Sequence, residues 1–141
     1  MKLEQHHVRQ LIEQWFVAFQ GADPAALCRL ITLPFTFSRH GVLSVLCNEA
    51  EFSAWWTNYV AQIRSDGKVA RGEILKVKVE PISATAALAR LQSARLDSND
   101  NVVAIVTTAF VIYHVDGGWK VGGSVADATM NVEEAELGLV G

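Results

Sequence analysis

The stretch VVAIVTTAFVIYHVDGGWKVGG, residues 102–123, decides the fold. It predicts two β-strands, over 101–115 and 118–126, joined by the turn residues Asp116-Gly117-Gly118. Because so short a connection joins antiparallel neighbours, the two strands form a hairpin. Both alternating residue sets of the first strand are apolar, so we expect this strand to be covered on both faces of a sheet.

Four more strands lie upstream of this hairpin. Residues 68–82 and 85–97 alternate or run apolar and are separated from their neighbours by short polar turns. With the hairpin, they predict an antiparallel meander. The segments 35–39 and 42–47 flank His40-Gly41 and predict a second hairpin.

Helical spacing dominates the first half of the chain. One apolar stripe repeats at i, i+3, i+4, i+7, i+8 and i+11: Val8, Leu11, Ile12, Trp15, Phe16 and Phe19. The same spacing returns in Phe52, Trp55, Trp56, Tyr59, Val60 and Ile63, after the capping-box pair Asn48 and Glu51. Between these stripes, Asp23-Pro24 predicts the start of a shorter helix that buries Leu27, Leu30 and Ile31 and ends before Pro34.

Composition limits the class of protein. The 141 residues suit a single domain, 1–141, in which 127–141 forms an acidic tail or short helix. Half of the residues are apolar and the net charge is −3, which excludes a disordered or fibrous chain. The cations are dispersed, so we expect neither nucleic acid nor an anionic membrane as a partner.

Membrane insertion and cofactor chemistry find no support in the sequence either. The most apolar run is shorter than the roughly 20 residues of a membrane helix. The first residues lack a signal peptide's apolar core, so we expect a cytoplasmic protein. Cys28 and Cys47 have no metal-ligand spacing, and we expect no metal and no cofactor.

The order of elements and several motifs resemble the nuclear transport factor 2-like superfamily, and within it the SnoaL-like and ketosteroid-isomerase-like proteins. The matching motifs are Asp23-Pro24, residues 85–88, Arg95-Leu96-Asp97, residues 110–113 and residues 116–121. The resemblance implies an α+β fold with element order α-α-β-β-α-β-β-β-β. In it, a cone-shaped, strongly bent, mainly antiparallel sheet is closed by three helices from the N-terminal half. Relatives use the enclosed pocket for catalysis, for ligand binding or for no known purpose, so the fold alone does not assign a function.

Strand parity suggests acid/base candidates for such a pocket. Glu73, as an acid/base group, and Arg71, as a group that orients the substrate, have the parity of the apolar face of their strand, unless Gly72 marks a bulge that reverses it and leaves both in water. Asp127 continues the inward face of the last strand as a candidate general base, unless the strand ends before it. Tyr113 is a candidate hydrogen-bond donor, although a packing role accounts for it as well.

Aromatic and basic side chains are the binding candidates. Trp15, Trp55 and Tyr59 belong to the helical stripes and form either plain core or the wall of a flat, apolar site. A substrate carboxylate would suit one of three strand arginines, although ordinary surface charges explain them more simply: Arg39, Arg90 and Arg95.

These residues favour a protein that binds a small apolar or aromatic molecule without catalysis. The resemblance leaves two alternatives: a cofactor-free isomerase, lyase or hydrolase with a pocket carboxylate, and an assembly domain without ligand. Ketosteroid isomerases carry a tyrosine on the first helix, whereas this chain has Trp15, Phe16 and Phe19 there. This difference weakens the enzyme alternative.

We also expect a homodimer through the convex face of the sheet. The helices cover only the concave face, and leaving the convex face in water would expose an apolar patch. Both residue sets of the strand over 102–115 are apolar: Val103, Ile105, Ala109 and Val111 on one face, and Val102, Ala104, Val106, Phe110 and Ile112 on the other. The alternative cover is the C-terminal tail, through Val132, Leu137, Leu139 and Val140.

Overall fold

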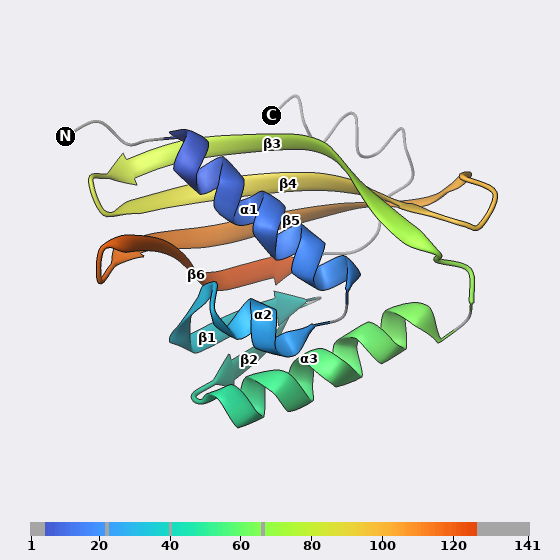
Figure 1. Cartoon of the computed structure of the whole chain (residues 1–141), viewed down its shortest axis with the longest axis horizontal. Coiled ribbons are helices and arrows are strands. Elements are labelled where there is room, and N and C mark those ends of the chain that lie inside the picture. The colour runs from blue at the N-terminus through green and yellow to red at the C-terminus, as the bar shows by residue number, and fades with distance from the viewer. Residues whose placement is uncertain (1–4, 22, 40, 66, 127–141) are drawn as a thin grey trace.

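The computed structural model describes residues 5–21, 23–39, 41–65 and 67–126 (Figure 1). The elements, in chain order, are α1 (Gln5–Gln20), α2 (Pro24–Cys28), β1 (Ile31–Arg39), β2 (Val42–Leu46), α3 (Glu49–Arg64), β3 (Arg71–Ser83), β4 (Ala86–Leu96), β5 (Val102–Val115) and β6 (Gly118–Ala126). This order is the expected one, and the α+β class is confirmed.

The six strands form one open sheet in the order β2-β1-β6-β5-β4-β3. All neighbours are antiparallel except β1 and β6, which run parallel, so the mainly antiparallel meander is confirmed. Between β5 and β6, Asp116 and Gly117 both have positive φ, at 50° and 81°. Two such residues make the tight turn whose twist suits an antiparallel hairpin.

The three helices close one face of the sheet. Figure 1 shows α1 crossing the strands diagonally, with α2 and α3 packed together beside β1 and β2. Both predicted N-caps are present, because the Asp23 carboxylate accepts from the Ala26 N–H and the Asn48 side chain accepts from the Glu51 N–H. Within the described residues, no helix is both long and apolar enough to cross a membrane.

The core lies between the helices and this concave face. Its largest fully buried side chains come from both layers: Trp56 and Phe52 from α3, Phe35 from β1 and Phe110 from β5. The Phe35 ring stacks on Trp15 and meets Phe52 edge-on. Aromatic rings from both layers therefore help to fix the helices to the sheet.

The prediction for the second helix was wrong at its C-terminal end. The helix ends at Cys28, and Ile31 is the first residue of β1, paired with Val121 of β6. The Val121 N–H donates to the Leu30 carbonyl at 2.8 Å, which starts this parallel pairing. Pro34 lies where the β1–β6 register is interrupted, so its missing N–H costs no ladder bond there.

Candidate functional site

Aromatic rings from both layers surround one cavity, called here the aromatic pocket. The rings that line it come from α1, α3, β1 and β5: Trp15, Phe16, Phe19, Trp55, Trp56, Tyr59, Phe37 and Phe110. The three predicted wall residues, Trp15, Trp55 and Tyr59, are therefore brought together at one site. Their role in binding a ligand stays a prediction.

Each part of this wall is held by contacts between rings. Trp55 and Tyr59 stack at 5.4 Å between ring centroids, one helical turn apart on α3. Phe37 of β1 contacts both of them, at 4.4 and 5.2 Å. Phe19 of α1 meets Trp56 edge-on at 4.8 Å. Because the rings support one another, the wall is preorganised around the cavity.

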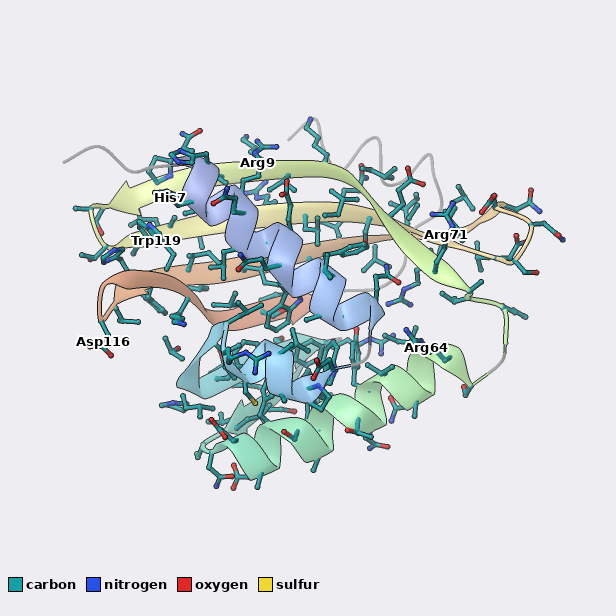
Figure 2. All side chains as sticks on the ribbon, viewed as in Figure 1. His7, Arg9, Arg64, Arg71, Asp116 and Trp119 are labelled. Carbon is teal, nitrogen blue, oxygen red and sulfur yellow. The ribbon has the colours of Figure 1, made fainter. Side chains whose placement is uncertain are left out.

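The pocket is partly open to solvent. Its cavity has a volume of about 70 Å³, inside a recess of about 790 Å³ that includes the opening. Arg64 at the end of α3 and Arg71 at the start of β3 both line it, and Figure 2 shows them near the same end of the molecule. The Arg64 guanidinium donates to the carbonyl of Gln20 at 2.8 Å, which ties α3 to α1 there.

Two arginines flank Tyr59, and one of them, Arg95, lines this pocket. The Arg39 guanidinium lies over the Tyr59 ring, 5.5 Å from its centroid. Arg95 of β4 lines the pocket and is half-buried, with Tyr59 as its hydrogen-bonding neighbour. Parity explains the position of Arg95, since Leu91, Ser93 and Arg95 alternate along β4 and all line the cavity.

The surroundings of Arg95 disfavour its positive charge. Burial lowers the pKa of the Arg95 guanidinium, Tyr59 opposes this effect, and the nearby charge of Arg39 lowers the pKa further. Arginine nevertheless stays protonated in proteins. The Arg95 guanidinium therefore keeps its positive charge although it is partly buried among aromatic rings.

Trp56 contributes a further donor. Its side chain is 2% exposed, and its indole Nε1–H is buried without a hydrogen-bond partner in the part of the chain that the structure describes. An indole N–H can only donate, so its natural partner is an acceptor atom. The helical spacing of Trp56 predicts only that its side chain is buried. No signal in the sequence marks its N–H as unpaired.

The expected inward position of Glu73 is wrong, whereas Arg71 lines the edge of the aromatic pocket. A bulge between Ile74 and Lys76 shifts the register of β3 against β4, so the parity of Val77 and Val79 does not extend back to these two residues. Ile74 packs against the core instead, and the Glu73 side chain is 57% exposed. The alternative of a reversing bulge therefore holds for Glu73 alone, and the bulge lies after Ile74 and not at Gly72.

Arg71 reaches the edge of the recess but is already paired. Its guanidinium donates to one carboxylate oxygen of Asp100 from Nε at 3.2 Å and from Nη2 at 2.9 Å. A weaker ion pair joins it to Glu73 at 3.8 Å. Arg71 therefore anchors the start of β3 to the β4–β5 turn.

Tyr113 and Asp127 do not complete an acid/base site. Tyr113 does not line the aromatic pocket, because its ring lies on the opposite face of the sheet against Gly122. The suggested inward orientation of Tyr113 is therefore wrong. Asp127 lies outside the described residues.

A second, more open recess lies near the start of α1, where Figure 2 labels His7 and Trp119. Its lining is polar and includes His114, whose ring meets Trp119 edge-on at 5.0 Å. No group of three His, Cys, Asp or Glu side chains that could hold a metal ion occurs within residues 5–21, 23–39, 41–65 and 67–126.

Solved structures share this architecture at low sequence identity. An uncharacterised protein with a cystatin-like fold from Caulobacter vibrioides superposes with a TM-score of 0.71 at 15% identity, covering 96% of each chain. An NTF2-like protein from Novosphingobium aromaticivorans superposes with a TM-score of 0.71 at 15% identity, and the match covers 98% of this chain and 89% of that protein's chain. A ketosteroid isomerase-like protein from Erwinia carotovora atroseptica superposes with a TM-score of 0.65 at 16% identity, and the match covers 93% of this chain and 99% of that protein's chain.

These likenesses establish the fold and not an activity. No curated protein sequence matches the chain significantly. Residues 4–129 match the family described as NTF2-like protein (DUF6841), a span that includes every described helix and strand. The chain therefore belongs to this NTF2-like family.

Proposed function

We propose that this protein binds a small apolar or aromatic molecule in the aromatic pocket, in the cytoplasm and without catalysing its conversion. The observation that carries the proposal is a cavity walled by aromatic rings of α1, α3 and the sheet, which stays open where a plain core would be filled.

The volume of the cavity limits the ligand. At about 70 Å³ it has room for about five water molecules, less than the ~150 Å³ of an apolar cavity that accepts benzene. One ring therefore fills the cavity and extends into the recess. Burying about 150 Å² of apolar ligand surface provides about 4 kcal/mol before the entropy cost of association, so the Kd of a simple ring compound is about 1 mM or weaker. Simple ring compounds must accordingly be tested at millimolar concentration.

Proton-transfer catalysis is the alternative. Of the described residues that line the pocket, none is Asp, Glu or His, so a general base is not among them. Asp127 is the remaining candidate from the sequence. If the alternative holds, Asp127→Asn abolishes turnover of a substrate and leaves its binding intact.

A matched pair of threonine substitutions on β5 tests the binding proposal. Thr108 lines the pocket, whereas its neighbour Thr107 does not, so Thr108→Phe fills the cavity and Thr107→Phe is the control. Saturation-transfer NMR with benzyl alcohol, p-cresol and indole is expected to detect binding to the wild type and to Thr107→Phe, and none to Thr108→Phe. Absence of transfer from all three compounds, or equal transfer in both variants, would refute the proposal.

We further propose the homodimer through the convex face. Val103, Tyr113 and Val125 are exposed there, away from the helices. Val125→Glu is expected to shift the sedimentation of a dimer to that of the 15.4 kDa monomer, while Val17→Glu on the exposed side of α1 leaves it unchanged. A wild-type monomer at micromolar concentration would rule out the dimer.

A further inference from the structure

The charged side chains that line the aromatic pocket all have the same sign. Among the described lining residues they are Arg64, Arg71 and Arg95, and no described carboxylate lines the pocket. Arg64 is engaged by the Gln20 carbonyl and Arg71 by Asp100. Neither Arg64 nor Arg95 has a described carboxylate as a partner, but Arg64 is held by a backbone carbonyl, so Arg95 is the lining cation left for a ligand anion.

Arg39 adds a second positive charge close to Arg95. It lies over the Tyr59 ring, and its charge acts on Arg95, so two like charges share the surroundings of one phenol. None of the ion pairs formed by described residues includes Arg39. Two guanidinium groups that are partly withdrawn from water and repel each other favour the approach of an anion.

Two further groups, on Trp56 and Tyr59, are hydrogen-bond donors. The Trp56 N–H is buried, unpaired and able only to donate, and the hydroxyl of Tyr59 lies near Arg95. Arg95 and Tyr59 thus bring donors to a cavity whose other walls are largely aromatic. The complementary ligand combines a flat apolar body with a group that is rich in acceptors and negatively charged.

We propose that the ligand of the aromatic pocket is an aromatic or apolar carboxylate whose carboxylate group is bound by Arg95, with the charge of Arg39 in support. This inference rests on the proposed binding function and names the chemical class of the ligand. A carboxylate is planar, as the guanidinium fork is, and accepts two parallel hydrogen bonds from it. In a cavity of about 70 Å³ it also occupies less space than a tetrahedral phosphate.

The proposal is tested with pairs of compounds that differ only in charge. Benzoate and benzamide, phenylacetate and phenylacetamide, and indole-3-acetate and indole-3-acetamide are titrated by NMR against wild type and four variants. Arg95→Gln removes the charge, Arg95→Lys keeps it without the fork, and Arg39→Gln removes the supporting charge. Arg90→Gln is the control, since Arg90 lies on the same strand but pairs with Glu80 outside the pocket.

We expect the acids to bind about tenfold to a hundredfold more tightly than the amides, a preference that Arg95→Gln removes and Arg90→Gln retains. Arg95→Lys is expected to restore part of it. If Arg95→Gln does not fold, Arg95→Lys and Arg39→Gln still test the proposal, because each should reduce the preference for acids over amides.

The two proposals fail in different ways. Equal affinity for acids and amides would overturn the carboxylate assignment and leave the binding function standing. A preference for acids that survives in Arg95→Gln and Arg39→Gln would overturn the assignment of these arginines. No binding of any acid or amide would overturn the proposed function, and this inference with it.

Discussion

The ring of Tyr113 on β5 lies so close to Gly122 on β6 that a Cβ at Gly122 would overlap Cδ2 and Cε2 of the ring. Gly122 is the extra residue of a bulge, since Val111 pairs with Gly123 and Ile112 pairs with Val121. The glycine thus provides the space in which the ring covers the bulged backbone. Tyr113 has a structural role on this face of the sheet.

Gly122→Ala is therefore expected to destabilise the fold by about 1–3 kcal/mol, through overlap with the Tyr113 ring. In a Tyr113→Ala background the same substitution should cost much less, because the overlapping ring is gone. Urea denaturation of the single and double variants measures this coupling. Gly118→Ala is the control, since a Cβ there meets nothing within 4 Å, and it should leave stability unchanged.

Trp56→Phe is expected to cost less stability than Trp15→Phe, although both remove the same atoms from buried rings. The reason is the unpaired Nε1–H of Trp56, whose burial costs about 1–3 kcal/mol and which phenylalanine lacks. Denaturation midpoints of the two variants without ligand check this expectation. If Trp56→Phe is the more damaging of the two, the indole N–H has a partner in solution.

Glu73→Gln is expected to leave both stability and ligand binding within error of the wild type. Its side chain is 57% exposed and does not line the pocket. Its 3.8 Å ion pair with Arg71 lies at the surface, where such pairs contribute about 0–1 kcal/mol. A loss of binding in NMR titrations with the same ring compounds would show that β3 turns inward in solution.

The local elements could be predicted because local chemistry determines them. Asp23 and Asn48 cap their helices through side-chain oxygens, and the stripe that contains Trp15 and Phe19 supplies part of the pocket wall. Because the helical period of 3.6 residues is fixed by geometry, a stripe on one face is visible in the sequence itself.

The positions of Glu73 and Ile31 could not be predicted in this way, since both depend on distant pairing. The bulge after Ile74 is a property of the register between β3 and β4, and Leu75 is left 50% exposed by it. Ile31 joins a strand because Val121, far along the chain, offers it a parallel partner. Alternation predicts which residues share a face only as far as the next bulge.

Acid is expected to weaken the β4–β5 hairpin through Asp97. One oxygen of its carboxylate accepts from the backbone N–H groups of Asn99 and Asn101, at 2.8 and 2.9 Å. The bond from the Asn101 backbone lowers the pKa of Asp97 most, desolvation opposes it, and the Asn99 backbone and Asn101 side chain lower it further.

Because the folded-state pKa lies below the ordinary value of 3.8, these bonds stabilise the fold above about pH 3.8 and are lost as pH falls through the folded pKa. Asp97→Asn should remove this part of the pH dependence, so that wild type and variant converge in stability as pH falls below 3.8. Urea denaturation from pH 7 to pH 2 measures the two curves. Asp116→Asn, in the β5–β6 turn, is the control and should keep the wild-type slope. Parallel curves for wild type and Asp97→Asn would contradict the role of these hydrogen bonds.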